Sequence, residues 1–202
     1  MDKIDQKRRC FLRRATTAVG GIGLVAATVP FVSYWMPSED TKAAGAPIHI
    51  DLSTLKPRQQ LTVPWRGMPI WVIYRDQTML DSLHTVQSHG MLRDPFCDLA
   101  QQPEYCKNTH RSIKPAYFIT IGICTHLGCV PTYRPDIGSV VADWPGGFYC
   151  PCHGSKYDLA GHVYKNVPAP LNLKIPNHEY LSDTIVVIGQ DQHGVQGTIN
   201  IS

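Results

Sequence analysis

Cys124-Thr-His-Leu-Gly-Cys129 and Cys150-Pro-Cys-His-Gly-Ser155 are the two stretches that decide the fold of this chain. Each box provides one Cys and one His at ligand spacing, as Cys-x-His in the first box and Cys-x2-His in the second. Together they supply two thiolates and two imidazoles, which suits a two-iron, two-sulfur cluster. Each box also contains a further cysteine, Cys129 or Cys152.

The ligand types indicate how such a cluster would behave. Cys124 and Cys150 are expected on one iron, and His126 and His153 on the other. A thiolate brings a full negative charge to its iron and a neutral imidazole brings none, so reduction becomes easier. The boxes therefore predict one [2Fe–2S] cluster of high potential.

Zinc is the competing interpretation, because two cysteines and two histidines are also a zinc ligand set. Zinc modules mostly show Cys-x2–4-Cys and His-x3–5-His pairs, whereas here each box mixes the two residue types. The boxes also offer six candidate groups, more than the four that zinc binds. The pattern favours iron–sulfur chemistry and leaves a zinc-stapled, membrane-tethered binding module as an alternative.

Outside the boxes, the sequence from residue 48 to 202 is mostly of β type. Short β-branched and aromatic runs at 69–74, 117–121 and 184–188 predict strands. Residues 179–181 and 184–186 predict a hairpin with the two-residue loop Ser182-Asp183. Residues 77–83 predict a brief helix, and the polar stretch 85–114 predicts a loop with at most a short helix. The fold class expected is all-β.

The N-terminus is first basic and then apolar. Residues 1–14 carry six Lys or Arg against two Asp, a net +4, which leaves −1 for the other 188 residues. Because the domain carries no basic stripe, we expect no binding to nucleic acid. Residues 15–36 contain no charged side chain and exceed the roughly 20 helical residues that span a bilayer. We predict a cytoplasmic tail over 1–14 and a transmembrane helix over 15–36.

Arg8-Arg9-Cys10-Phe11-Leu12 is typical of a twin-arginine export signal, which suits a domain that folds before it crosses the membrane. A cleaved secretory signal usually has an apolar region of about 7–15 residues, so this longer segment predicts a retained anchor. Cleavage at Ala43-Ala44-Gly45-Ala46 is the alternative. Residues 37–47 are small, polar and punctuated by Gly and Pro, which predicts a flexible neck. The domain is then expected in the periplasm of a bacterium, on a single-pass inner-membrane anchor.

Two more cysteines lie in the exported part, where disulfides persist. Cys97 and Cys106 either form a local disulfide or remain separate thiols, and the sequence favours neither. Cys10 is expected on the cytoplasmic side.

With these features together, the chain resembles the Rieske iron–sulfur subunits of the cytochrome bc1 complex, ubiquinol–cytochrome c oxidoreductase. The resemblance covers nearly the whole length, and the two boxes are its specific part. It implies an antiparallel Rieske-type β-sandwich with a small cluster-binding subdomain at about residues 122–170, tethered by one N-terminal transmembrane helix.

The resemblance also implies roles for individual residues. The matches to the cluster ligands are Cys124, His126, Cys150 and His153, and the matches to a disulfide are Cys129 and Cys152. Ser155 and Tyr157 match hydroxyl groups that donate to cluster sulfurs and raise the potential. Leu127 matches an apolar residue at the quinone-docking tip. Val167-Pro-Ala-Pro170 matches a proline loop over the cluster, with Val167 where the family often has glycine.

The implied function is coupled transfer of one electron and one proton from quinol, here ubiquinol. His126 and His153 are the candidate proton acceptors, and the electron passes to cytochrome c1 after the domain swings on its neck. The implied partners are cytochrome b, cytochrome c1 and quinol, within a dimeric complex. The other histidines match no ligand position, and most are expected at the surface or in structural hydrogen bonds; they are His49, His84, His89, His110, His162, His178 and His193.

Two related classes remain as alternatives. The Rieske small subunit of a periplasmic arsenite-oxidase-type enzyme also carries a twin-arginine signal, but it takes its electron from a molybdenum partner. A dioxygenase-type ferredoxin fits less well, because that class lacks the disulfide pair and needs no export.

Overall fold

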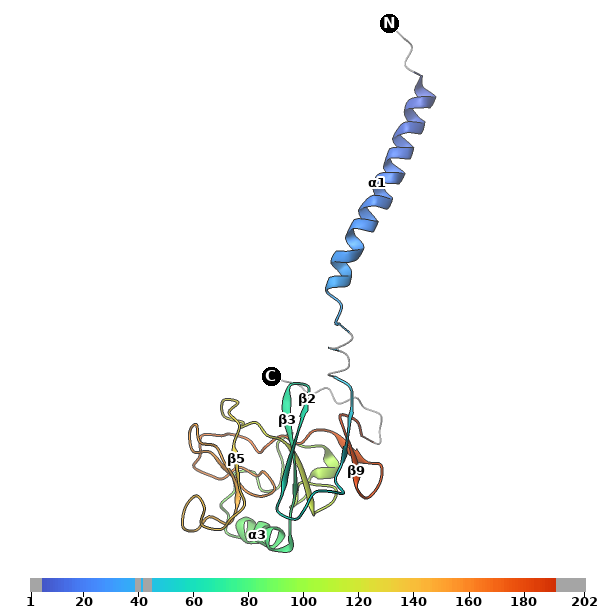
Figure 1. Cartoon of the computed structure of the whole chain (residues 1–202). Coiled ribbons are helices and arrows are strands. Elements are labelled where there is room, and N and C mark those ends of the chain that lie inside the picture. Colours follow the sequence, from blue (N-terminus) through green and yellow to red (C-terminus); the bar gives the residue numbers. More distant parts are fainter. Residues whose placement is uncertain (1–4, 39–40, 42–44, 192–202) are drawn as a thin grey trace. The chain divides into compact units, whose positions relative to one another are not determined.

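A computed structural model describes residues 5–38, 41 and 45–191 (Figure 1). The chain divides into two compact units, Met1–Ala43 and Ala44–Ser202. The predicted neck, 37–47, falls partly outside the described residues. The ends of the predicted tail and domain, residues 1–4 and 192–202 with His193, lie outside them as well.

The first unit is built on one long helix, α1 (Gln6–Tyr34). Asp5 caps its start, because the carboxylate accepts hydrogen bonds from the backbone N–H groups of Lys7 and Arg8 at 3.0 and 3.3 Å. By length and composition, α1 is the only helix among the described residues that could cross a membrane. It starts well before the predicted boundary at residue 15, since the basic tail continues the helix, and it ends two residues before Met36.

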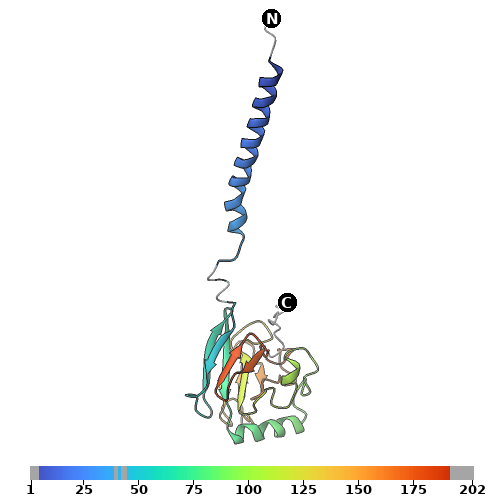
Figure 2. The same ribbon diagram turned by 90° about the vertical axis from the view of Figure 1, so that its right-hand side faces the viewer.

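The described residues of the second unit form three small antiparallel sheets, together with two helical segments (Figures 1 and 2). The first has the order β1-β9-β8, from β1 (Ile48–Asp51), β8 (His178–Tyr180) and β9 (Ile185–Ile188). The second has the order β2-β3-β4, from β2 (Gln60–Trp65), β3 (Met68–Tyr74) and β4 (Tyr117–Ile121). The third has the order β5-β6-β7, from β5 (Thr132–Arg134), β6 (Gly147–Tyr149) and β7 (Lys156–Tyr157). The all-β fold class is confirmed.

Strand β3 connects two hydrophobic cores. Successive side chains of a strand point to opposite faces. Ile70 and Val72 pack into the core shared with β1, β4 and β9, while Trp71 and Ile73 pack into the core beneath the two Cys/His boxes. Trp71 stacks there on Phe148 of β6, with ring centroids 5.4 Å apart. Burial on both faces explains why the sequence of β3 is almost continuously apolar.

The helix predicted at 77–83 is longer than expected. Helix α3 runs from Gln77 to Ser88, with Asp76 as its cap, so the loop predicted from residue 85 begins only after the helix ends. The extra turn forms because Val86 continues the buried stripe of Met79 and Leu83. A short 3-10 helix, η1 (Glu104–Cys106), is the other helical piece in that stretch.

The predicted hairpin of β8 and β9 is confirmed, but its two-residue loop is wrong. The strands end at Tyr180 and resume at Ile185, so four residues connect them. The hydroxyl oxygen of Ser182 accepts hydrogen bonds from the N–H groups of Thr184 and Ile185, at 3.3 and 3.1 Å. This serine-centred turn holds Thr184 out of the strand.

Candidate functional site

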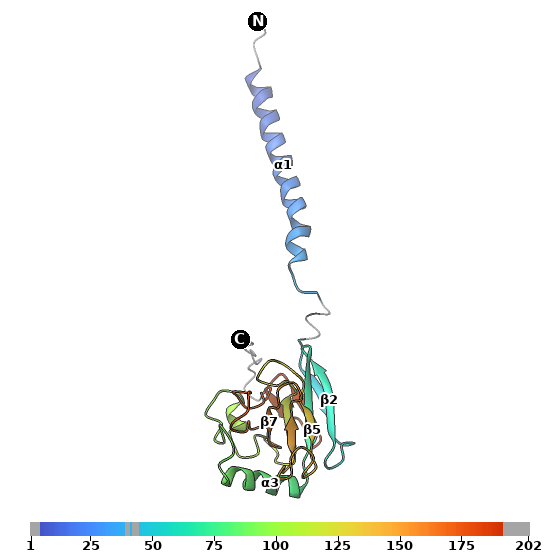
Figure 3. The ribbon, with the colours of Figure 1, turned by 90° about the vertical axis from the view of Figure 1, so that its left-hand side faces the viewer.

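The two Cys/His boxes are loops next to the strands of the third sheet. Figure 3 shows this sheet from the side of β5 and β7. The first box lies between β4 and β5, and the second between β6 and β7. Both form the same turn: the N–H of Cys124 binds the carbonyl of Cys129, and that of Cys150 binds the carbonyl of Ser155. Gly128 and Gly154 close the turns with φ angles of 79° and 76°, a region that glycine adopts without strain.

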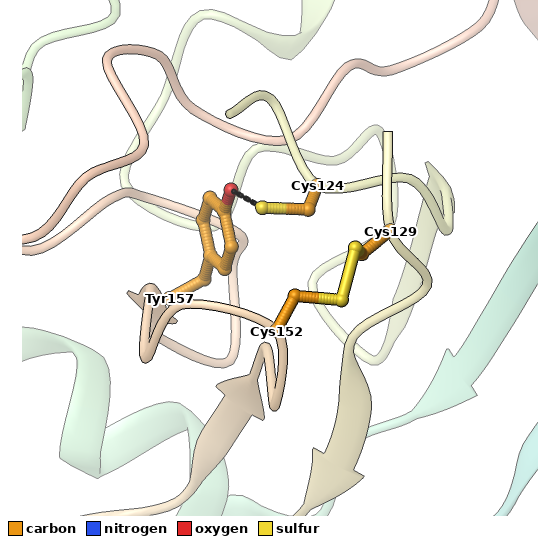
Figure 4. Close-up of a disulfide and its surroundings, with 4 residues drawn as sticks. All are labelled: Cys124, Cys129, Cys152 and Tyr157. Atoms are coloured by element: carbon orange, nitrogen blue, oxygen red, sulfur yellow. Dashed lines mark hydrogen bonds between the residues drawn. A yellow bond between two sulfur atoms is a disulfide. The ribbon is translucent and has the colours of Figure 1, made fainter. Parts of the chain in front are cut away.

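In these two turns, Cys124 and Cys150 are buried, whereas Cys129 and Cys152 are bonded to each other. Cys124 and Cys150 are buried, and burial raises the pKa of the Cys150 thiol. Cys129 and Cys152 form a disulfide between the boxes, with Cα atoms 6.7 Å apart, as predicted (Figure 4). The Cys150 sulfur lies within 4.8 Å of both disulfide sulfurs, but bonded sulfurs are not thiolates, so that trio is not a metal site.

The two histidines of the boxes lie side by side. Their ring centroids are 4.8 Å apart and the rings are nearly perpendicular, at 86°. His153 is exposed and His126 is half-buried. The Nδ1 atom of His126 is buried and has no hydrogen-bond partner among the described residues. An orphaned ring nitrogen on the buried side is where a metal ligand is expected.

Tyr157 contacts the first box from β7 (Figure 4). Its hydroxyl lies 3.3 Å from the Cys124 sulfur and accepts a hydrogen bond from the Thr125 N–H at 3.1 Å. Thr125 Oγ1 is also 3.1 Å away, and it donates its own proton to the Leu171 carbonyl. The Tyr157 proton is therefore free to point at the sulfur or at Thr125. Burial raises the pKa of Tyr157, which keeps the hydroxyl protonated.

Ser155 and the proline loop also meet at the site. The buried Ser155 Oγ accepts a hydrogen bond from the Ala169 N–H at 3.0 Å, so its own proton remains available. Thr125 binds the C-terminal end of the proline loop, because its hydroxyl donates a hydrogen bond to the Leu171 carbonyl. Sequence reasoning missed Thr125; its position next to a ligand cysteine was the only signal. Leu127, in the first box, is 71% exposed.

The described residues include further cysteines and histidines outside the two boxes. Cys97 and Cys106 are separate buried thiols, which answers the question that the sequence left open. His49, His84 and His89 are exposed, whereas His162 and His178 are buried and hydrogen-bonded. Within the described part of the chain, no other histidine joins the two boxes.

The donor set fits a Rieske cluster. The sulfurs of Cys124 and Cys150 are buried, the two imidazoles lie against each other, and His126 has a buried ring nitrogen without a partner among the described residues. The mixed ligand set matches the arrangement in which two histidines replace two cysteines on one iron.

Comparisons with known proteins agree with this chemistry. Residues 2–38 match the family model "Ubiquitinol-cytochrome C reductase Fe-S subunit TAT signal", and residues 103–177 match the Rieske [2Fe–2S] domain. The ubiquinol–cytochrome c reductase iron–sulfur subunit of Allochromatium vinosum is 52% identical over 191 residues, 94% of this chain and 91% of that protein. The mitochondrial Rieske subunit of Bos taurus is 40% identical over 89% of this chain and 58% of its own length.

One solved structure is also similar to the chain. The chain resembles one from a structure titled "Hyperthermophilic respiratory Complex III", at 26% identity and a TM-score of 0.48, over 88% of this chain and 98% of that one. The identity to the A. vinosum protein extends over both units and shows the family by itself. This chain belongs to the family of ubiquinol–cytochrome c reductase iron–sulfur subunits, the membrane-anchored Rieske electron carriers of the cytochrome bc1 complex.

Proposed function

We propose that Cys124, His126, Cys150 and His153 hold the [2Fe–2S] cluster and that the subunit takes one electron and one proton from quinol. The observation that carries this proposal is the pair of adjacent imidazoles on the outer side of two buried sulfurs. When bound, the cluster supplies a one-electron acceptor of high potential.

The protein's own part is to place a proton acceptor beside that electron acceptor. The orphaned Nδ1 of His126 faces the buried side, so Nε2 is the ring nitrogen left for a quinol hydroxyl. His153 is exposed and lies against His126, and it offers a second nitrogen at the same surface. A general base needs only hydrogen-bond reach of the proton it removes. Either imidazole meets that condition for a quinol docked at the tip.

Two exposed apolar side chains belong to this part of the chain. Leu127 and Val130 are 71% and 55% exposed, and both belong to the first box or its immediate continuation. Exposed apolar side chains at the end of a domain mark a contact surface. We infer that these residues dock against cytochrome b at the quinol pocket and exclude water while the proton moves.

We also propose a compartment for the β unit and a route for the electron to cytochrome c1. The twin-arginine segment and the basic flank of α1 support a cytoplasmic N-terminus and a β unit in the bacterial periplasm. The small, polar residues of 37–47 would let the β unit move between cytochrome b and cytochrome c1.

In the assembled complex, shortening or stiffening this neck should slow cytochrome c1 reduction and leave the cluster intact.

Single-turnover kinetics of the purified complex test the proposed function. Quinol should reduce the cluster, and cytochrome c1 should then be reduced by it. An arsenite-oxidase-type subunit would instead be reduced in the presence of arsenite and a molybdenum partner, and it would not respond to quinol. A redox-silent protein that contains zinc would contradict both.

Replacing Tyr157 with phenylalanine should leave the cluster bound but lower its midpoint potential and slow quinol oxidation. The reason is the loss of a hydroxyl 3.3 Å from the Cys124 sulfur, which stabilises the added electron through a hydrogen bond. A redox titration followed by EPR measures the shift. Tyr74→Phe is a matched control, since Tyr74 lies on β3 and pairs with Tyr117. An unchanged potential in Tyr157→Phe would remove the proposed hydrogen bond.

A further inference from the structure

A second pair of histidines lies outside the two boxes. The imidazole rings of His84 and His110 have centroids 5.7 Å apart and planes at 88° to each other. The proposed cluster ligands His126 and His153 have nearly the same arrangement, at 4.8 Å and 86°. The proposed electron and proton path does not use His84 or His110.

The rings of His84 and His110 have no other polar partner. In the part of the chain that the structure describes, none of their ring nitrogens makes a hydrogen bond, and Nδ1 of His110 is buried without one. A buried polar atom without a partner calls for an explanation, such as a bound ion or water. Imidazole is also the commonest side-chain ligand of metal ions in proteins.

Hydrogen bonds hold the backbone of His110 from both sides. Its N–H donates to Oδ1 of Asn108 at 3.1 Å, and its carbonyl accepts a hydrogen bond from Nη1 of Arg75 at 2.9 Å. Arg75 is fully buried, and its Nε donates to the Pro115 carbonyl at 2.9 Å. The loop that presents His110 is therefore fixed before any ligand binds.

Helix α3 presents His84 next to this loop. Leu80, four positions earlier, packs against the core beneath the boxes. Side chains four positions apart on a helix are neighbours on one face, so His84 lies at the edge of that core. The His84 side chain is exposed, so its ring can turn toward an ion that arrives from solvent.

The charged groups around the pair act in opposite directions. The guanidinium of Arg75, bonded to the His110 carbonyl, repels a cation. The exposed Asp81 lies three positions before His84 on α3, which makes the two side chains neighbours. Its Oδ1 accepts a hydrogen bond from Gln77 at 2.8 Å, which leaves the other carboxylate oxygen to attract a cation. Because these effects oppose each other, the two imidazoles are left as the main source of affinity.

The ring separation fits two imidazoles on one ion. With metal–nitrogen bonds of about 2.0–2.1 Å and tetrahedral angles, the ring centres of two such ligands are roughly 5 Å apart. A small rotation of the exposed His84 ring would close the difference from 5.7 Å. Imidazole ligands suit Zn²⁺ and Cu²⁺, whereas Mg²⁺ and Ca²⁺ prefer oxygen.

We propose that His84 and His110 form a second metal site of the β unit, which binds a divalent transition-metal ion such as Zn²⁺ or Cu²⁺. Water completes the coordination. The site lies between α3 and the loop before β4, and it depends neither on the two boxes nor on the proposed function.

Cu²⁺ is the probe that tests this site, because it binds nitrogen ligands most tightly among the divalent first-row metals. One equivalent is added to the full-length protein with its cluster bound and oxidised. A Cys10→Ser background removes the one free thiol that is not buried among the described residues. The oxidised cluster gives no EPR signal, because its two ferric irons are magnetically coupled, so the copper signal is observed alone. Pulsed EPR should detect two coordinated imidazoles.

Substitution of either histidine should remove this binding. His84→Gln and His110→Gln should each weaken Cu²⁺ binding by more than the roughly 10–100-fold that loss of an outer-sphere partner costs at a metal site. His89→Gln is the matched control, since His89 is exposed at the end of α3, and it should bind Cu²⁺ like the parent. Unchanged affinity in His84→Gln would overturn the proposal. His84 is exposed, so this result does not depend on whether the His110 variant folds.

The number of imidazoles decides the other outcomes. A single coordinated imidazole in the parent protein would overturn the proposal, and so would a two-imidazole signal that persists in both variants. Visible absorbance of the cluster, recorded on the same samples, reports the ligand assignment at the boxes separately. Absence of the cluster would contradict the proposed function, whereas the response to His84→Gln would still decide the second site.

Discussion

Replacing His153 with alanine is expected to abolish both the cluster signal and quinol oxidation. The histidine pair is the only set of imidazoles that the described residues bring to the two boxes, with centroids 4.8 Å apart. Losing one of the four proposed ligands would leave an incomplete ligand set for the cluster, so we expect the cluster to be lost or to become labile. EPR of membranes and quinol–cytochrome c reductase assays measure the two losses.

A matched control keeps this result specific. His49 is an exposed histidine on β1, and His49→Ala should retain the cluster and full activity. Full activity in His153→Ala would contradict the ligand assignment. Loss of both signals in His49→Ala as well would show that alanine substitution destabilises the domain in general.

Removing the disulfide is the second change with a large expected effect. Replacing Cys129 and Cys152 with serine should lower the free energy of unfolding by about 2–5 kcal/mol, the range for native disulfides in small domains. The bond closes a loop with a sequence separation of 23 and ties together the two ligand turns. The cluster should therefore be lost at a lower denaturant concentration, which visible absorbance and circular dichroism follow together.

The single variants sharpen this test. Cys129→Ser and Cys152→Ser should each behave like the double variant, because either one removes the same bond. Cys10→Ser, in α1, is the control and should unfold like the wild type. Wild-type stability and cluster retention in the double variant would show that the boxes hold together without the crosslink.

The site was largely predictable from the sequence because it is local. Each box contains its proposed ligands within six residues, and the same turn forms in both, so the spacing of Cys124, His126, Cys150 and His153 was enough to propose them as ligands. Strand β4 was predicted with its bounds, since its β-branched run is short and sharply delimited. Tyr157 and the Cys129–Cys152 pair came from the family resemblance.

What the sequence did not predict depends on contacts between distant residues. Cys97 and His162 are 65 positions apart, and neither lies in a motif that indicates a partner. Val86 reads as part of a polar loop until Trp144 and Tyr164 are known to pack around it. The division into three small sheets likewise follows from pairings such as β1 with β9, across most of the domain.

An EPR-monitored redox titration of membranes containing the chain, with and without a quinone-site inhibitor, is the most direct test of a [2Fe–2S] cluster at a quinol site. A rhombic [2Fe–2S] signal at positive potential, with a line shape that changes when the inhibitor binds, is the predicted result. A Rieske signal whose line shape is the same with and without the inhibitor would contradict the quinol site. It would favour the small subunit of an arsenite-oxidase-type enzyme. Folded protein without any such signal would contradict the cluster itself.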